Sequence, residues 1–230
     1  VGEHPGPSPE GGGRNRLGDV PADGRSLTGN FQITPETEIE PKGKIARFEG
    51  NLQAIRTLKD IEAQGRMATA EEQAVLAKYV GWGQLSNAFD DYSGEFGKKR
   101  VQTLKDLLTE KEYEDARAST INAHYTSREV IGPIYSALEK IGFPGGRIME
   151  RSVGVGRFFG LLPESMRTSV LLGNDLDSLS ARIAKQLYQK ADIRNLDYAN
   201  LKLPNNFFDL AVTNVPFADI SPYDPDYSKF

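Results

Sequence analysis

The amino-acid sequence predicts an α/β fold with a mostly parallel sheet, preceded by a small helical module and an N-terminal arm. Three observations support this prediction. From about residue 121 onward, short apolar runs typical of strands alternate with helical patterns. A glycine-rich stretch, residues 150–160, follows the first of these runs, as a strand-to-helix turn would. Residues 45–120 carry apolar side chains at helical spacing, whereas residues 1–44 are rich in Gly, Pro and Ser.

The composition is that of a globular protein and excludes several classes of function. Of the 230 residues, 38% are hydrophobic and 26% are charged. No run approaches the roughly 20 apolar residues of a membrane span, and the polar start has no signal-peptide core. We therefore expect a cytoplasmic protein with no membrane partner. Cysteine is absent, which excludes thiolate chemistry. The only histidines are His4 and His124, so no metal centre is expected.

The first 120 residues are expected to form an arm and a helical module. Residues 1–44 should be disordered or extended, because few apolar groups there offset the loss of chain entropy, although residues 31–33 could pair locally. Apolar spacing and Thr-x-x-Glu capping boxes predict the helices of the module at residues 45–64, 69–80 and 109–119. The single tryptophan, Trp82, is expected to pack against these helices rather than stack on a base.

The net charge of −4 indicates that any phosphate-binding surface is local or lies outside this chain. The one dense basic cluster in the sequence is Lys98, Lys99 and Arg100. Such a run is usually a solvated face, but it could also contact a phosphate backbone.

Residues 121–230 are expected to alternate between strands and helices. A Thr126-x-x-Glu129 capping box predicts a first helix, in which Pro133 should cause a kink or a late start. The elements expected next are a strand at 147–150, a helix near 158–162, a strand at 169–173, a helix through 179–187, a short strand near 193 and a strand at 207–213. A sheet that ends on its fourth strand has an unpaired edge, so we expect this chain to be part of a longer protein.

Polar residues follow the predicted strands where ligands of open α/β sheets bind, which is outside the carboxyl ends of the strands. They are Glu150 with the glycine turn after the first strand, Asp175 after the second, Asp197 after the third, and Asn214, Val215, Pro216 and Phe217 after the fourth.

A dinucleotide site is one interpretation of the glycine turn. Such a site has the pattern G-x-G-x-x-G and an acidic residue about 20 positions later. Gly154 and Gly156 fit the pattern, and Asp175 lies 21 residues after Gly154, but the third glycine, Gly160, comes one position late. A hydride-transfer site has no need of Asn-Val-Pro-Phe after the fourth strand, which speaks against this interpretation.

Several segments resemble a known family when taken in order. Residues 208–217 (FDLAVTNVPF) resemble the FDxxxxNPP(F/Y) signature of S-adenosylmethionine-dependent amino-methyltransferases, and residues 150–160 are similar to their cofactor motif. Residues 123–127 (AHYTS) resemble the segment that precedes this motif in N6-adenine DNA methyltransferases of the gamma type. Residues 78–83 (KYVGWG) look like a segment of the large methylase–helicase proteins of phages and conjugative elements.

This resemblance implies a fold and a function. The fold is the cofactor-binding part of a Rossmann-like methyltransferase domain, at residues 121–230. The function is methylation of adenine N6 in DNA, in a modification or anti-restriction role. The partners are DNA, from which the target adenine is flipped out, and the remainder of a methylase–helicase chain. This chain alone is expected to methylate DNA weakly or not at all.

The resemblance also assigns catalytic roles to the tetrapeptide after the fourth strand. The adenine amine is a poor nucleophile because its lone pair is delocalised into the ring. The side-chain oxygen of Asn214 and the carbonyl of Val215 would accept its hydrogens and free that lone pair. Pro216 would keep Val215 extended, and Phe217 would stack on the flipped base. Methylation of cytosine C5 would need a cysteine nucleophile by family analogy, and the chain has none.

The cofactor roles implied by the resemblance belong to the first three strand ends and to the segment before them. Glu150 and the backbone around Gly154 and Gly156 would hold the methionine portion of S-adenosylmethionine. Asp175, or Asp177 in its place, would bind the ribose, and Asp197 the adenine amino group. Tyr125 and Thr126 would close over the cofactor. Bland interpretations remain for some of these residues: Asp197 as a loop N-cap, Tyr125 as core, His124 as structural and Asp209 as a strand-start residue.

The sequence departs from the family pattern at Arg151, Arg157 and Val215. Either arginine could intrude on the cofactor pocket, or Arg157 could point out from the helix that follows the turn. Two alternative functions therefore stay open. One is a non-catalytic assembly module with a decayed cofactor site, and the other is methylation of a protein glutamine or an RNA amine.

Overall fold

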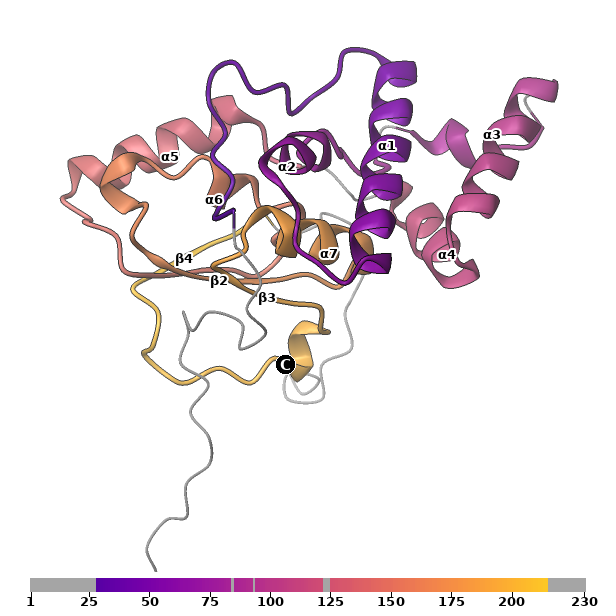
Figure 1. Ribbon diagram of the computed structural model, residues 1–230. Coiled ribbons are helices and arrows are strands. Elements are labelled where there is room, and N and C mark those ends of the chain that lie inside the picture. The colour runs from indigo at the N-terminus through magenta and orange to yellow at the C-terminus, as the bar shows by residue number, and fades with distance from the viewer. Residues whose placement is uncertain (1–27, 84, 93, 122–124, 215–230) are drawn as a thin grey trace, which may run out of the picture.

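The computed structural model describes residues 28–83, 85–92, 94–121 and 125–214 (Figure 1). Its centre is a sheet of four parallel strands in the order β3-β2-β1-β4. The strands are β1 (Arg147–Glu150), β2 (Val170–Asn174), β3 (Asp192–Arg194) and β4 (Leu210–Val212). The predicted α/β class and parallel sheet are confirmed, and the strand order is compatible with a Rossmann-like fold.

The two central strands, β1 and β2, are buried on both faces, as their apolar runs require, whereas the outer strands β3 and β4 are only partly buried. Neighbouring residues of a strand point to opposite sides, so Ile148 and Leu171 join the main hydrophobic core. Met149 and Leu172 join a second, small cluster on the other side of the sheet with Leu201.

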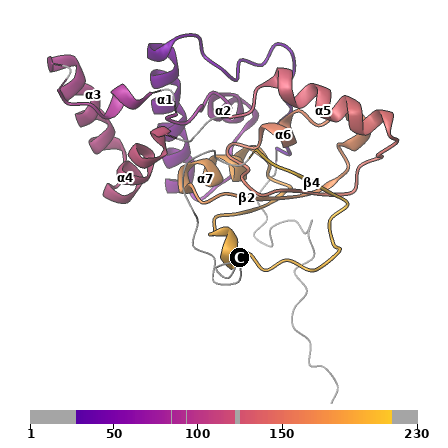
Figure 2. The ribbon, with the colours of Figure 1, turned by 180° about the vertical axis from the view of Figure 1, so that it is seen from behind.

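The connections between strands follow the right-handed rule. From β1 the chain passes through α6 (Arg157–Gly160) and η3 (Glu164–Met166) to β2, and from β2 through α7 (Ser178–Leu187) to β3. Both α6 and α7 lie on one side of the sheet, together with α2 and α5, in the two opposite views (Figures 1 and 2). To reach β4 beyond β1 the chain reverses direction, and it crosses the other face through η4 (Tyr198–Asn200) and a loop. The crossing loop supplies Leu201, Leu203 and Phe208 to the second cluster.

The helices before the sheet are mostly those that the sequence predicts. They are α1 (Lys44–Ala63), α2 (Ala70–Leu76), η1 (Ser86–Phe89), α3 (Gly94–Leu107), α4 (Glu110–Ala118), η2 (Ser119–Ile121) and α5 (Arg128–Lys140). The capping boxes at Thr69 and Thr109 are both confirmed, with reciprocal bonds to Glu72 and Glu112. Helix α3, which contains the basic cluster, was not predicted as a helix.

The capping prediction for helix α5 is wrong, and of the two effects expected of Pro133 the late start does not occur. Its N-cap is Ser127 rather than Thr126, and no side chain caps it. Pro133 does not delay the start of the helix, which begins five residues earlier at Arg128 and continues to Lys140. The missing N–H of Pro133 removes one bond from the ladder, and the remaining turns, with Ile131 and Tyr135 buried, hold the helix in place.

Residues 28–43 of the N-terminal arm are extended but fixed to the sheet domain. Phe31 N donates to Leu187 O at 2.8 Å, and Ile33 N donates to Gly160 O at 2.8 Å. Residues 31–33 therefore pair with segments far along the chain and not locally as expected, and disorder does not extend to residues 28–43. Residues 1–27 lie outside the described part of the structure.

The helical module and the α/β part share one hydrophobic core. Trp82 is 1% exposed and makes edge contacts with Phe48, Tyr79 and Phe89, which confirms that it packs against helices. Across the boundary, Arg182 of α7 binds Glu62 of α1 and Glu112 of α4. The boundary expected at residue 120 therefore does not separate two cores.

In the described part of the chain, no helix combines the length and the apolar character that crossing a bilayer requires.

A buried amide fixes the turn that carries Trp82. Asn51 of α1 is fully buried; its Nδ2 donates to Gly81 O at 2.7 Å, and its Oδ1 accepts from Val80 N at 2.9 Å. Gly81 has φ 66°, and a Cβ there would lie 3.1 Å from the Tyr125 ring. The turn is thus bound on one side by Asn51 and on the other by the segment that precedes α5.

Asn51→Ala is expected to lower the free energy of unfolding by about 2–4 kcal/mol, because two buried backbone groups lose their partners. Urea unfolding measures the change. Gln53→Ala, an exposed position on the same helix, is the matched control and should change it by less than about 0.5 kcal/mol. A loss below about 1 kcal/mol for Asn51→Ala would contradict the role given to this amide.

Candidate functional site

The strand order brings two of the predicted site residues, Glu150 and Asn214, to the ends of neighbouring strands. The chain adds β2 and β3 on one side of β1 and then returns to add β4 on the opposite side of β1. The direction in which strands are added therefore reverses between β1 and β4, although all four strands stay parallel. Ligands of open α/β sheets bind at such a switch point, outside the carboxyl ends of the strands. Glu150, the last residue of β1, is in register with Val212 of β4, and half-buried Asn214 follows two residues later.

Glu150 is a buried carboxylate with an unused acceptor. Its side chain lies on the face of the main core and is 3% exposed, and its Oε2 has no hydrogen-bond partner. Burial raises the pKa of Glu150 well above its usual range, and the negative charge of Asp175 raises it further. An unpaired buried carboxyl oxygen is costly, so this position is suited to a cationic donor.

The glycine turn after β1 is built for close packing. Gly154 and Gly156 both have positive φ, at 52° and 72°. A Cβ at Gly154 would lie 2.4 Å from the Tyr125 ring, and one at Gly156 would lie 2.2 Å from the Tyr188 ring. The two glycines thus admit aromatic rings of the chain itself on the side where a side chain would stand.

The third glycine has a packing role that explains its late position. A Cβ at Gly160 would lie 2.6 Å from both Ile33 Cδ1 and Tyr188 Oη. Gly160 O also accepts from Ile33 N. This glycine therefore seats the N-terminal arm rather than completing a dinucleotide pattern.

Asp175 holds the glycine turn to the end of β2. Its Oδ2 accepts from Gly154 N at 2.6 Å, and its Oδ1 accepts from Asp177 N at 2.9 Å. Burial raises the pKa of Asp175 to about 6, against the opposing effect of these backbone bonds. The Gly154 amide is therefore occupied by a carboxylate, which would repel a phosphate at the place where a dinucleotide needs one.

Two other acidic residues of the prediction act as helix caps. Asp177 is the N-cap of α7 and accepts from Leu179 N at 3.3 Å and Ser180 N at 3.1 Å. Asp197 is exposed and caps η4 through a bond from Ala199 N at 3.1 Å. The loop N-cap interpretation of Asp197 is therefore confirmed; its proposed contact to the adenine of a cofactor stays a prediction.

Arg157 points away from the glycine turn and toward the arm. Its side chain is 4% exposed and binds the Glu40 carboxylate, Ile39 O at 3.0 Å and Thr126 O at 3.2 Å. The guanidinium also lies 5.4 Å from the centre of the Tyr125 ring. Of the two possibilities weighed from sequence, neither holds as stated: Arg157 binds the arm instead of the sheet edge, but it is buried and does not point out from its helix.

The Tyr125 ring lies against Gly154 of the turn, and Thr126 O accepts from Arg157; their closing over a cofactor stays a prediction. The Tyr125 hydroxyl is 2.7 Å from Ser180 Oγ at the start of α7, and burial raises the pKa of this hydroxyl. Through its ring and hydroxyl, Tyr125 joins Gly81, Gly154 and α7 at one point. Both the core interpretation and the cofactor-closing interpretation of Tyr125 are compatible with this position.

Sequence reasoning missed an apolar rim at the same sheet edge. Leu176 is 73% exposed, and Leu196 and Tyr198 are each 42% exposed. The Arg151 guanidinium lies 3.4 Å from the centre of the Tyr198 ring. In the sequence, only position could have indicated this rim: Leu176 and Tyr198 directly follow Asp175 and Asp197, the acidic residues after β2 and β3.

Other predicted residues fall in different places. Asp209 stands just before β4 and binds the Arg147 backbone N at 2.8 Å and its guanidinium at 3.1 Å, so its strand-start role is confirmed. Val215, Pro216, Phe217 and His124 lie outside the described residues. Within the described ranges, no group of three or more His, Asp or Glu side chains is placed to hold a metal ion.

Comparison with known proteins adds no family. No model of a protein family matches the chain, and no curated protein matches it.

Arg157→Met is expected to release the arm, because Glu40, Ile39 and Thr126 lose their common partner. The free energy of unfolding should fall by about 2–4 kcal/mol, and amide hydrogens of Phe31 and Ile33 should exchange faster. Arg151→Met, an exposed arginine in the same turn, is the control and should leave both unchanged. Unchanged exchange at Phe31 and Ile33 would disprove the link between Arg157 and the arm.

Proposed function

We propose that the chain is the cofactor-binding part of an S-adenosylmethionine-dependent methyltransferase that acts on the N6 amine of adenine in DNA. The observation that carries this proposal is the pairing of Glu150 with the strand that leads to Asn214, at the switch point of the sheet. Glu150, a buried carboxyl group with an unpaired oxygen, pairs with Val212, and Asn214, which resembles the catalytic Asn of the family, follows two residues later at the same edge.

The charge at this sheet edge supports a cationic ligand over an anionic one. Glu150, Asp175 and Asp177 gather around the glycine turn, and the Gly154 amide already donates to Asp175. A pyrophosphate would meet these carboxylates without a free amide at Gly154, which weighs against NAD. S-adenosylmethionine carries an ammonium and a sulfonium, so its charge complements the edge.

The residues present fit this cofactor in part, and they have distinct tasks. Glu150 Oε2 would accept from the ammonium of the methionine portion, since it has no other donor. Asp175 retains lone pairs beyond its two backbone bonds for the ribose hydroxyls. Leu176 and Tyr198 offer exposed apolar surface to the adenine. The rings of Tyr125 and Tyr188 fill the side-chain direction of the two glycines, so the cofactor would lie along the other side of the turn.

When bound, S-adenosylmethionine supplies an electrophilic methyl group on sulfur. The protein would orient the acceptor: the Asn214 side-chain oxygen would accept a hydrogen bond from the adenine amine and draw its nitrogen toward tetrahedral geometry. That hydrogen bond would make the nitrogen lone pair more available as a methyl acceptor. DNA and the rest of a methylase–helicase chain, as the expected partners, belong to the same proposal.

The alternative of a decayed cofactor site is less supported. It was based on Arg151 and Arg157, and the guanidinium of Arg157 binds Glu40 of the arm instead of the sheet edge. Arg151 stacks on the Tyr198 ring at the rim, so an adenine bound there would share that ring with it.

Titration with S-adenosylmethionine tests the cofactor, and the chain is expected to bind it. Glu150→Gln should weaken binding about tenfold or more, because a charge-assisted bond to the ammonium is lost. Calorimetry measures the affinity, with Glu164→Gln, an exposed residue of η3, as the control. No binding at millimolar cofactor would refute the proposal.

Asn214→Ala is expected to leave cofactor affinity within about twofold, because the amide faces the substrate amine rather than the cofactor. It should abolish the slow incorporation of labelled methyl groups into DNA adenine that we expect of this chain. Incorporation that survives Asn214→Ala would contradict the catalytic role, and incorporation into a glutamine or RNA substrate instead would change the substrate class.

Cofactor affinity should rise with pH through the pKa of Asp175, which is about 6. A proton on Asp175 or Glu150 removes the negative charge that a cationic ligand needs, so affinity should fall by up to about tenfold per pH unit below that value. Asp175→Asn should flatten the profile. An affinity that is independent of pH between about 5 and 7 in the unmodified chain would contradict the assignment.

A further inference from the structure

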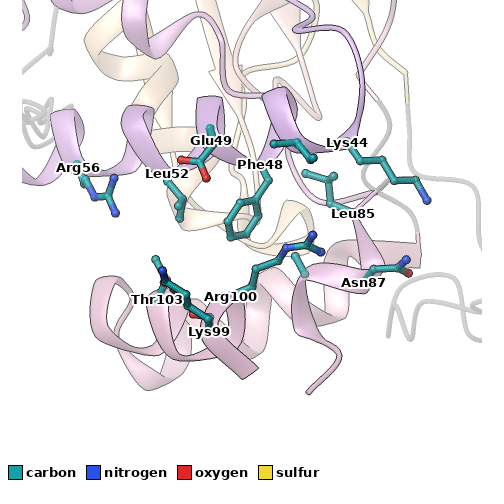
Figure 3. Close-up of a pocket in the computed structure, with 12 residues that line it drawn as sticks. Lys44, Phe48, Glu49, Leu52, Arg56, Leu85, Asn87, Lys99, Arg100 and Thr103 are labelled. Atoms are coloured by element: carbon teal, nitrogen blue, oxygen red, sulfur yellow. Dashed lines mark hydrogen bonds between the residues drawn. The ribbon is translucent and has the colours of Figure 1, made fainter. Parts of the chain in front are cut away.

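A cleft on the helical module, separate from the sheet edge, has the charge that the chain as a whole lacks. Its volume is about 440 Å³, and it lies between α1, η1 and α3 (Figure 3). None of the residues that line it belongs to the candidate site. The chain carries a net charge of −4, so a basic cleft is a local departure from its average.

The shape of the cleft follows from its apolar floor. Phe48 and Leu52 of α1 and Leu85 before η1 line it, and all three are buried in the main core. Arg100 of α3 reaches across with its guanidinium 5.9 Å from the Phe48 ring centre, which holds α3 against α1 (Figure 3).

Cations surround this floor on both sides. Lys44 and Arg56 stand toward the two ends of the cleft along α1, and Lys99 and Arg100 face them from α3 (Figure 3). One carboxylate, Glu49, lies among the four cations. Among the described residues, no ion pair neutralises Lys44, Arg56 or Lys99. The cleft therefore presents a net positive charge to solvent.

The remaining polar lining suits phosphate oxygens. Thr103 and Asn87 also line the cleft, and Lys, Arg, Thr and Asn are residue types that contact the phosphates of nucleic acids. Lys44 and Arg56 are 12 residues apart on one helix, which corresponds to about 18 Å. That length matches the rise of about five nucleotides of one DNA strand.

We propose that the α1–α3 cleft binds the phosphate backbone of DNA, as a contact additional to the site at the sheet edge. The choice of DNA among polyanions rests on the proposed function. The proposed contacts are to phosphates, which fix the position of DNA and carry no sequence information directly. An acidic protein segment is the competing occupant.

The test measures DNA affinity in the absence of cofactor, by fluorescence anisotropy with a labelled duplex at several salt concentrations. The variant carries Arg56→Gln and Lys99→Gln together, and leaves Arg100 and its packing on Phe48 intact. We expect affinity at low salt to fall about tenfold or more, and the salt slope to decrease by about two, since each phosphate contact contributes about 0.9.

The control carries Lys140→Gln and Lys190→Gln, which remove the same charge at exposed positions that precede β1 and β3, at the amino edge of the sheet. It should retain DNA affinity within about twofold. Thermal unfolding of each protein shows whether the fold is kept.

Three outcomes would overturn the proposal: no DNA binding by the unmodified chain at low salt, an equal loss in variant and control, or competition by polyglutamate as strong as by unlabelled DNA. A titration of the same proteins with S-adenosylmethionine separates this proposal from the previous one. The cleft variant should bind cofactor like the unmodified chain. Loss of cofactor binding in all proteins, with DNA binding still dependent on the cleft, would refute the proposed function alone.

Discussion

A single buried guanidinium connects three parts of the chain that are distant in sequence. Arg157 begins the short helix after the glycine turn, and it binds Glu40 and Ile39 of the arm and the carbonyl of Thr126. A charge with 4% exposure is stable only if its partners surround it, so the arm and the segment before α5 must close together around it. The position of Tyr125 over Gly154, and with it the wall of the candidate site, depends on this closure.

Cationic and acidic side chains are concentrated in different parts of the chain. Arg157 neutralises Glu40 on one side of the turn, whereas the other side carries the carboxyl groups of Glu150 and Asp175, whose pKa values burial raises. In the helical module the distribution is reversed, with cations around the α1–α3 cleft. A chain of modest net charge can in this way hold carboxyl groups at one site and a positive surface at another.

The parts that the sequence predicts well are those set by local chemistry. The capping boxes at Thr69 and Thr109 depend on residues three positions apart, and the strands on short apolar runs. Helix α3 was missed because Gly94 and Gly97 open it and few apolar residues mark its period. At the site, Glu150, Gly154 and Asp175 could be found because parallel strands bring their carboxyl ends to one edge. The direction of Arg157 could not, since its partner Glu40 lies 117 residues away.

The unequal cover of the two faces of the sheet has a consequence for the motion of β4. The helices protect one face, whereas the small cluster of Met149, Leu172 and Leu201 protects the other. Among the described strands, β4 pairs only with β1 and is three residues long. Strand β3 is equally short and pairs only with β2. Local opening costs least where few apolar contacts hold a segment, so the two outer strands should open before β1 and β2. The strand that leads to Asn214 is therefore one of the two that a bound partner can order most.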